Sequence, residues 1–490
     1  MPEKSDKDIS VSGVQKDNIE GRNSYIKAVI IMGVFTFVFL GAEYLFVNVV
    51  SNVTSESGAV FFQNCVLGIS AVGFALYPIY NRYVCKASRV VPAVVILLIS
   101  VVSLIVLSMG ISYGIILVTG FTQFFLLGIT GSSVYYTATQ LITDRRYIAR
   151  VAGTAYMTGV LLQFANNNFV KSDIAEAVFL SLFLILLDGI IVVHEAGIYK
   201  INAVNGNVSG ANQNYTEAGQ KSGVGNAAGV SLIILIVFMT CIFSTLDNAV
   251  TLVHAAGTVN IGQAPRLLLA ASGIVSGFLF DIKNRRFMDI IMYCVMVMSI
   301  MSVVMVNIPG AFITGLVIFY ISAGFFAVFF TAGFMELSYY MKTPELWAGL
   351  GRAVNNITAA VITSGSLTLL SNSNSVTSIV VVLLLFVAAS VMTYIYAYQR
   401  KKILEVPLTE AEEAATDEKD RLGIFMIRYE FTDREKEVCE YLINTDSSVQ
   451  DIADNMHLSR RTVERYISSI YEKTGVKSRV GLLRVYNEED

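Results

Sequence analysis

Charged residues are scarce in this chain of 490 residues. Asp, Glu, Lys and Arg together make up 15% of the sequence, whereas a soluble globular protein carries about 25%. Hydrophobic residues make up 54%. This composition excludes an ordinary soluble domain as the main part of the chain and predicts a protein that lies mostly in a membrane. The formal net charge of -3 does not indicate a partner, because two unlike regions can offset one another.

Cysteine and histidine are also rare, with five and three residues respectively. The cysteines lie mostly in apolar runs or beside basic loops, without CxxC spacing, at Cys65, Cys85, Cys241, Cys294 and Cys439. The sequence therefore predicts no disulfide, no metal site and no cofactor. No nucleophile with a partner base and no phosphate-binding loop is recognisable, which argues against an enzyme.

Long apolar stretches follow a polar N-terminal segment, residues 1–24. This segment has no cleavage site after an apolar run, so it is interpreted as a flexible cytoplasmic tail and not as a signal peptide. About 20 apolar residues are needed to cross a bilayer as a helix. Twelve such stretches are predicted, at about residues 25–50, 58–80, 90–109, 112–138, 151–169, 175–196, 229–250, 264–281, 287–307, 311–335, 350–371 and 376–398.

Lys and Arg are distributed unevenly between the predicted loops. With the N-terminus inside, the cytoplasmic segments up to Lys402 contain 21 of them, Arg352 included, whereas the outer segments contain only Lys171 and Arg266. Lys and Arg of short loops stay on the cytoplasmic side. Both termini are therefore predicted to be cytoplasmic, in a multi-pass membrane protein.

The predicted spans fall into two sets of six, residues 25–196 and 229–398, joined by a connector rich in Gly, Asn and Ser at residues 197–228. A loop at the end of the eighth span contains Gly277, Asp281, Lys283, Arg285 and Arg286. With the six-plus-six layout, this loop resembles a motif of the major facilitator superfamily, with Asn284 in place of a glycine. The resemblance implies the fold of that family and a loop that braces helices at the cytoplasmic face. The loop after the second span lacks the acidic residue, and an ordinary ion pair at a helix end is the alternative interpretation.

A few ionisable or polar side chains lie inside the predicted spans, among them Glu43, Gln123, Asp247 and Arg266. Such groups are costly to bury in a bilayer and usually line a cavity or pair with one another. Glu43, Asp247 and Arg266 fall in the outer parts of their helices, where a vestibule between the two halves would lie. We expect these four residues to contact a small-molecule ligand. The alternative is that Asp247 and Arg266 lie at the water interface, and that the neutral residues form hydrogen bonds between helices.

The composition changes at residue 399. Residues 399–428 are predicted to form a linker that begins with the basic residues 400–402 and contains an acidic, Ala-rich segment at residues 409–420, either helical or unstructured. Residues 429–490 then show the pattern of a small helical domain. Thr432 and Glu435 have the spacing of a capping box for a first helix, and Ser459 is a natural N-cap for a third. An apolar stripe between them, Val449, Ile452, Ala453 and Met456, predicts a second helix.

This C-terminal segment resembles the LuxR/GerE DNA-binding domain over its entire length. The family's features occur in order: Thr432, Arg434, Glu435, Glu437 and Val438, then Asp451–Ala453, Leu458–Ser459, Thr462–Val463, Ile470–Tyr471, Lys473, Gly475–Val476 and Ser478–Arg479. The resemblance implies a four-helix domain with a helix-turn-helix, whose third helix enters the major groove of double-stranded DNA.

The exposed side of that third helix is predicted to bind DNA through Arg460, Arg461, Thr462, Glu464, Arg465 and Ser468. By resemblance, Glu464, Arg465 and Ser468 occupy base-reading positions, and Arg460 and Arg461 hold phosphates. Many members of the family have Lys at the position of Glu464 and His at that of Tyr466, so the operator sequence does not carry over. The fourth helix, from Arg479, is by resemblance the dimer contact, although packing within one copy is the alternative.

These patterns predict an all-α protein: a polytopic twelve-helix membrane domain at residues 25–398, followed by a LuxR-type helix-turn-helix domain. The arrangement resembles membrane-bound LuxR-type regulators with transporter-like sensor domains that are found in some bacteria, and this resemblance implies a place in the bacterial cytoplasmic (inner) membrane. It implies a transcription regulator whose membrane domain senses an unknown small molecule, and whose DNA-binding domain pairs on DNA. Two alternatives are a secondary transporter with a regulatory DNA-binding tail and a simple membrane tether.

Overall fold

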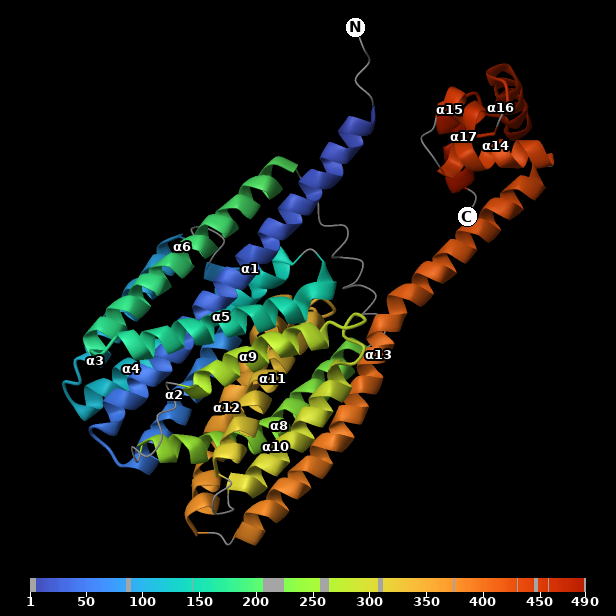
Figure 1. Cartoon of the computed structure of the whole chain (residues 1–490). Helices are drawn as coiled ribbons and strands as arrows, with labels where there is room; N and C mark the ends of the chain where they lie inside the picture. The colour runs from blue at the N-terminus through green and yellow to red at the C-terminus, as the bar shows by residue number, and fades with distance from the viewer. Residues whose placement is uncertain are drawn as a thin grey trace. The chain divides into compact units, whose positions relative to one another are not determined.

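The computed structural model describes residues 6–84, 90–142, 144–205, 224–255, 264–306, 312–372, 375–429, 431–444, 448–456 and 458–488. Within these ranges the chain is helical and contains no strand, which confirms the all-α class for this part of the protein. The chain divides into two compact units, Met1–Ile403 and Leu404–Asp490, each with its own hydrophobic core (Figure 1).

The first unit is a bundle of long helices that run side by side (Figure 1). They are α1 Asp6–Ser51, α2 Glu56–Ile79, α3 Val90–Ser108, α4 Tyr113–Leu141, α5 Ile148–Phe169, α6 Asp173–Asn205, α8 Val224–Ala255, α9 Ala264–Phe280, α10 Met288–Val306, α11 Phe312–Ser338, α12 Pro344–Asn372 and α13 Ser375–Arg428. A π-helical turn, Tyr80–Val84, follows α2, and a short 3-10 helix, Arg145–Tyr147, precedes α5. Helix α1 begins at Asp6, within the tail predicted to be flexible. Most of the predicted connector, residues 206–223, lies outside the described residues.

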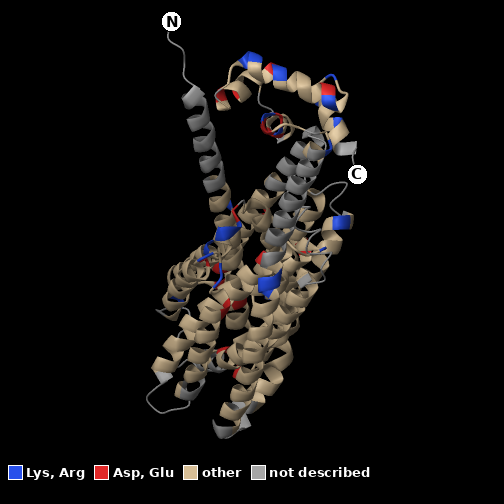
Figure 2. Ribbon diagram, turned by 90° about the vertical axis from the view of Figure 1, so that its right-hand side faces the viewer, with Lys and Arg blue, Asp and Glu red and all other residues tan. Residues whose placement is uncertain are grey.

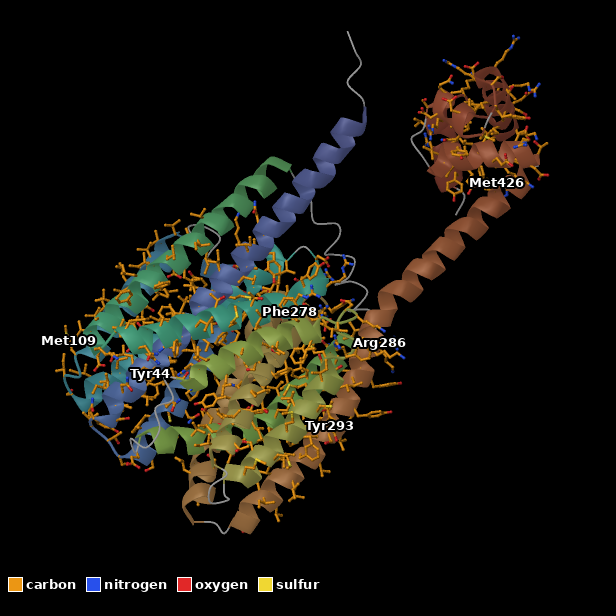
Figure 3. The ribbon with its side chains drawn as sticks, viewed as in Figure 1. Tyr44, Met109, Phe278, Arg286, Tyr293 and Met426 are labelled. Atoms are coloured by element: carbon orange, nitrogen blue, oxygen red, sulfur yellow. The ribbon has the colours of Figure 1, made fainter. Side chains whose placement is uncertain are left out.

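Eight helices of the described chain are long and apolar enough to cross a bilayer. These segments are Asn23–Ser51, Glu56–Tyr83, Val90–Ser108, Tyr113–Leu141, Asp173–Val193, Gly225–Asn248, Ile313–Ser338 and Ile379–Ile403, and two shorter apolar helices are Pro265–Phe280 and Met288–Ser302. Apolar side chains cover the outer faces of the bundle (Figure 3), such as Leu98 in α3 and Leu384 in α13, which are 58% and 66% exposed. Several membrane-spanning helices are therefore indicated, and the count of twelve stays a prediction.

The first six helices pack closely on the last six along two seams. Helix α2 packs against α12, and α5 packs against α9. At the second seam Gly153 and Gly277 face each other, and a Cβ added to Gly277 would lie 2.7 Å from the carbonyl oxygen of Ala149 and 3.1 Å from the Cα of Gly153. Glycine is required at this position because the two helix backbones approach so closely.

Basic residues of the first unit gather toward one end of the bundle (Figure 2). Arg286, in the connection between α9 and α10, lies at the opposite end from Met109, in the connection between α3 and α4 (Figure 3). Among the described residues the bundle is thus polarised in the way that the count of Lys and Arg predicts for a membrane protein.

The second unit consists of four short helices and the last turns of α13. The helices are α14 Asp433–Asn444, α15 Val449–Asn455, α16 Arg460–Thr474 and α17 Arg479–Glu488. Their core includes Val438, Ile452, Val463, Ile470 and Leu482, each with no exposed surface. Phe425 and Met426, which the sequence analysis placed in the acidic linker, also lie in this core, and the ring of Phe425 is 5.4 Å from that of Tyr486. Phe425 and Met426 therefore belong to the second unit, and the linker is shorter than predicted.

Candidate nucleic-acid interface and central cavity

The orientation of α16 on α14 depends on the carboxylate of Glu435. This group accepts hydrogen bonds from Lys473 Nζ at 2.7 Å, from Ser469 Oγ at 2.6 Å, and from both the backbone N–H at 2.7 Å and the Oγ1 at 2.9 Å of Thr432. Burial opposes the negative charge, but these hydrogen bonds outweigh it and lower the pKa of Glu435 to about 2. Thr432 and Glu435 were predicted to form a capping box. Half of this box is present, because the backbone N–H of Thr432 donates to the Glu435 carboxylate. In the other half, the Thr432 hydroxyl donates to the same carboxylate, whereas in a capping box it would accept from a backbone N–H.

The ends of α15 and α16 are set by local signals. Ser459 is the N-cap of α16 and accepts from the backbone N–H of Thr462 at 3.2 Å, as predicted. Gly475 ends the helix with a φ of 70°, a conformation that favours glycine. A full capping box between Ser448 and Asp451 begins α15, and the hydrogen bonds from Ser448 lower the pKa of Asp451. This box was not predicted, although Ser at 448 and Asp three residues later have the spacing that identifies one.

The outward side of α16 carries the predicted DNA-binding residues. Arg460, Arg461, Glu464, Arg465 and Ser468 are all exposed, and Val463 and Ile470 on the opposite side are buried. The side chains of Arg460 and Glu464 form an exposed ion pair, with Nε and Oε1 2.9 Å apart. An exposed pair of this kind contributes little to stability, about 0 to 1 kcal/mol, so both groups can exchange it for another partner.

Three further features complete this face. The Arg465 guanidinium lies over the ring of Tyr466, with 5.5 Å to the ring centroid. The Thr462 hydroxyl is 2.7 Å from that of Ser459 at the start of the helix. The Ser468 hydroxyl donates to the carbonyl of Glu464 at 2.9 Å. The face thus presents three guanidinium groups, one carboxylate and short hydroxyl side chains over about two and a half helical turns.

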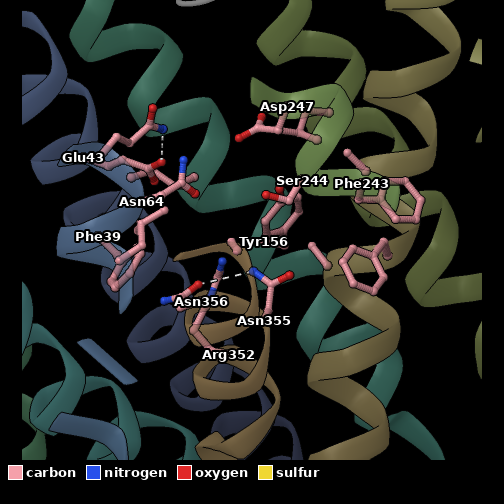
Figure 4. Close-up of a pocket in the computed structure, with 18 of the residues that line it drawn as sticks. Phe39, Glu43, Asn64, Tyr156, Phe243, Ser244, Asp247, Arg352, Asn355 and Asn356 are labelled. Carbon is pink, nitrogen blue, oxygen red and sulfur yellow. Dashed lines mark hydrogen bonds between the residues drawn. The ribbon is translucent and has the colours of Figure 1, made fainter. Parts of the chain in front are cut away.

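A cavity of about 200 Å³ lies among the helices of the first unit (Figure 4). Helices α1, α2 and α5 from the first six contribute to its wall, as do α8, α9, α11 and α12 from the last six. We call it the central cavity. Its polar lining consists of Glu43, Tyr44, Gln63, Asn64, Tyr156, Ser244, Asp247, Arg266, Tyr320, Arg352, Asn355 and Asn356.

The charged groups of the central cavity do not form ion pairs with one another. Glu43 Oε1 instead accepts a hydrogen bond from Gln63 Nε2 at 2.7 Å on the cavity wall (Figure 4). Arg266 and Arg352 have neither a salt bridge nor a hydrogen bond among the described residues, and the Nε of each is buried without an acceptor. The Arg352 guanidinium lies over the rings of Phe39 and Phe330, at 5.3 and 5.5 Å.

Hydrogen-bonded side chains connect the walls of the cavity. Asn64 of α2 donates to Asn248 of α8 at 2.9 Å, and Asn248 donates to Ser366 of α12 at 2.6 Å. Asn356 of α12 donates to Ser70 of α2 at 2.9 Å. The first and the third of these bonds join the first six helices to the last six, because each runs between α2 and a helix of the second set.

The structure brings three of the four predicted ligand contacts together. Glu43, Asp247 and Arg266 all line the central cavity. Gln123 does not: it is fully buried in α4, and both polar atoms of its amide lack a hydrogen-bond partner among the described residues. Arg352 was missed as a cavity residue, because it begins an apolar stretch and was therefore counted with the cytoplasmic loops.

The predicted loop motif lies at the junction of α9 and α10. Asp281 accepts from the backbone N–H groups of Ala149 at 3.1 Å and Arg150 at 2.8 Å, in the first turn of α5. A carboxylate at this position is favoured by the positive end of the helix dipole. Lys283 and Arg286 of the same loop are exposed. Lys283, Asn284 and Arg285 all have φ between 47° and 62°, so the backbone there adopts a left-handed conformation that favours glycine.

Arg285 belongs to a buried group of charges, which we call the loop cluster: Asp281, Arg285, Asp289, Glu336 and Arg400. Arg285 Nε donates to Glu336 at 2.9 Å, and Arg400 Nε donates to the other oxygen of that carboxylate at 2.8 Å. The cluster joins α9 and α10 to α11 and α13 by ion pairs that are excluded from solvent. Removal of one member of such a group is strongly destabilising.

Comparison with known proteins identifies the second unit. No curated protein matches the chain in sequence. Residues 430–486 match the family model for bacterial regulatory proteins, luxR family. This segment covers α14 to α17 except for the last residues of α17, and it includes the whole exposed face of α16. The chain therefore ends in a DNA-binding domain of the LuxR family, which supports a transcription regulator.

Proposed function

We propose that the chain is a membrane-anchored transcription regulator that senses a small molecule in the central cavity and controls transcription through its C-terminal domain. The observation that carries the proposal is the presence of both parts in one chain. A LuxR-family domain is fused to a helical unit with eight helices apolar enough to cross a bilayer. That unit encloses a cavity with four charged side chains.

In the proposed complex, α16 lies in the major groove of double-stranded DNA. Glu464, Arg465 and Ser468 contact base edges, because they project from the middle of the exposed face of the helix. Arg460 and Arg461, in the first turn, hold phosphates together with the hydroxyl of Thr462. Glu464 is released from Arg460 when that arginine binds a phosphate, and its carboxylate then accepts from a cytosine N4 amine.

For the membrane unit we propose twelve spans with both termini in the cytoplasm, in the six-plus-six arrangement of the major facilitator superfamily. Two observations support this proposal. The central cavity is lined by helices of both sets, and Asp281 and Arg285 of the loop motif contact α5 and α11, as a brace between helices requires. With this topology the Lys and Arg of the loops lie where the DNA is.

Transcript analysis tests the regulator directly. Cells with the intact gene are compared with two strains: one lacks the gene, and the other carries Arg465→Ala, which leaves the membrane unit unchanged. We expect a defined set of transcripts to respond to deletion of the gene and to Arg465→Ala in the same way. Unchanged transcripts in both strains would contradict the proposal.

A secondary transporter with a regulatory tail is the second candidate, favoured by a cavity that lies between two sets of helices. A transporter predicts that the chain truncated after residue 403 still moves a solute across the membrane. A sensor predicts that this truncation abolishes the transcriptional response and leaves solute uptake unaltered. Uptake measured in vesicles that contain the truncated chain therefore separates the two functions.

A further inference from the structure

The charges of the central cavity are arranged at two levels. Helix α1 presents Phe39 and Glu43 to the cavity one turn apart, which corresponds to about 6 Å along the helix axis. The Arg352 guanidinium lies over Phe39, and Glu43 therefore lies about one turn further along. Asp247 faces Glu43 from α8, and Figure 4 shows both acidic side chains at the end of the cavity opposite Arg352.

Arg352 is held in an unusual environment for a cation. Its guanidinium carbon lies over the rings of Phe39 and Phe330, and the amides of Asn355 and Asn356 lie on the next turn of α12. Aromatic rings attract a guanidinium by a cation–π interaction, and the Nε–H of Arg352 has no acceptor among the described residues. The edge of an arginine donates two parallel hydrogen bonds, which match a carboxylate.

The opposite end of the cavity is acidic. Glu43 and Asp247 place two carboxyl groups there, Arg266 lies within electrostatic reach of both, and none of the three forms an ion pair among the described residues. Charges that are removed from bulk water without a partner are costly, so a ligand that supplies the missing partners gains affinity. A primary amine complements the two carboxylates.

The wall between the two ends is aromatic. Phe243 and Phe326 stack with 4.6 Å between their centroids, and Tyr156, Phe319 and Tyr320 also line the cavity. A ligand with an apolar or aromatic body fits this wall. The cavity volume of about 200 Å³ favours a molecule with the size of a single amino acid.

We propose that the central cavity binds an amphoteric small molecule, whose carboxylate is held by Arg352 and whose amine lies between Glu43 and Asp247. This proposal rests on the proposed function in one respect, which is that the central cavity is the sensory site. It goes further by giving the ligand two opposite charges, a few ångströms apart, on an apolar or aromatic body.

Matched probes test the proposal on the full chain, purified in lipid nanodiscs. The first set shares one carbon skeleton: phenylalanine carries both charges, phenethylamine carries only the positive charge, and 3-phenylpropionate carries only the negative charge. A second set is leucine, isoamylamine and 4-methylvalerate. Calorimetric titration is expected to show that one or both amino acids bind about tenfold or more tightly than either singly charged analogue, because each loses one charge-assisted contact.

Variants identify which residue holds which charge. Arg352→Gln is expected to reduce the affinity for the amino acid to that of the amine and to leave the affinity for the amine unchanged. Glu43→Gln is expected to lower the affinity for the amino acid and the amine and to leave the carboxylic acid unaffected. Arg352→Lys keeps the positive charge but loses the two parallel N–H donors of the guanidinium, so it should give an intermediate loss of affinity for the amino acid. This variant is used if Arg352→Gln does not fold. Arg286→Gln, exposed in the loop after α9, is the control and should change nothing.

Three results would overturn the proposal: equal affinity for a singly charged analogue, equal losses for all three probes in Arg352→Gln, or binding of none of the amino acids. A transcriptional reporter distinguishes this failure from failure of the proposed function. Amino acids that bind without altering transcription would contradict the sensor and support the cavity chemistry. Transcription that depends on the chain, with a cavity that binds only singly charged probes, would contradict the cavity chemistry alone.

Discussion

Glu435 is the residue on which the pH stability of the DNA-binding unit is expected to depend. Its pKa of about 2 lies below the value near 4.3 of an unfolded chain. A carboxyl group whose pKa is lowered on folding stabilises the fold above the unfolded pKa, and this contribution is lost as the pH falls through the folded pKa. Urea unfolding of residues 404–490 should therefore show a decline in stability between about pH 4.5 and pH 2.

The matched variants for this experiment are Glu435→Gln and Glu440→Gln. Glu435→Gln should cost about 1.5 to 3 kcal/mol at pH 7, because it removes the charged partner of Lys473. It should also flatten the decline at acidic pH. Glu440 is exposed on the same helix, and its replacement should leave both quantities nearly unchanged. A decline of equal size in Glu435→Gln would show that other groups cause it.

Arg465 and Arg460 are expected to differ in what they contribute to DNA binding. Arg465→Ala should weaken discrimination between operator variants by about 1 to 3 kcal/mol, the value of a bidentate guanine contact. Arg460→Ala should weaken binding to all DNA equally and reduce the slope of log affinity against log salt by about one. Band-shift titrations at several salt concentrations measure both effects. The same sequence-independent loss in both variants would refute the separation of roles.

At the scale of helices, the close contact of α5 and α9 is expected to tolerate no side chain at Gly277. An added Cβ would meet backbone atoms of Ala149 and Gly153, which cannot move without separating the helices. Gly277→Ala should therefore destabilise the unit by about 1 to 3 kcal/mol, as overpacking does in other cores.

Gly365 in α12 is the matched control for this substitution. A Cβ at Gly365 would meet nothing within 4 Å, so Gly365→Ala should be neutral or slightly stabilising, since alanine favours helix more than glycine does. Thermal unfolding of both variants in detergent, followed by circular dichroism, gives the comparison. A Gly277→Ala variant as stable as Gly365→Ala would mean that the helices can separate at this seam without cost.

Local sequence patterns predicted helices better than they predicted the ends of units and the walls of cavities. Ser459 and the apolar stripe of α15 act within one helix, so their effect follows from spacing alone. Phe425 was assigned to a linker because its partner Tyr486 is 61 residues away in the sequence, and only the folded chain brings the two rings to 5.4 Å. Arg352 was assigned to a loop for the same reason, since its neighbours Phe39 and Phe330 lie on other helices.

Glu43, Asp247 and Arg266 line the central cavity together, as expected of ionisable groups that lie in apolar helices and need a polar environment. The same reasoning did not distinguish Gln123. An uncharged amide can be enclosed between helices at much lower cost, and Gln123 lies buried in α4 away from the cavity.

At the scale of the whole molecule, we expect that pairing of the DNA-binding units controls operator binding. Residues 421–490 contain 11 Lys or Arg and 13 Asp or Glu, a net formal charge of -2. A domain without excess positive charge gains little non-specific affinity from phosphates, so one copy should bind DNA weakly. Two copies on half-sites about one DNA turn apart should bind far more tightly.

The fourth helix offers only a small surface for such pairing. Leu482 of α17 is fully buried within its own unit, and Tyr486 is almost so, whereas Val480 is 76% exposed. A contact centred on Val480 is too small to hold two copies together at low concentration. The membrane unit can raise the effective concentration by bringing two chains side by side, which gives ligand binding a way to control transcription.

We therefore expect residues 404–490 alone to be monomeric and to bind the operator weakly, and a fusion of this segment to an unrelated constitutive dimer to bind it tightly without ligand. In the fusion, Val480→Asp should have little effect on folding, because the side chain is exposed, and should reduce operator affinity if α17 forms the contact. Arg484→Ala, on an exposed position of the same helix, serves as the comparison. Sedimentation and band-shift titrations decide the matter: tight operator binding by the monomeric fragment would show that pairing is not the step that the membrane unit controls.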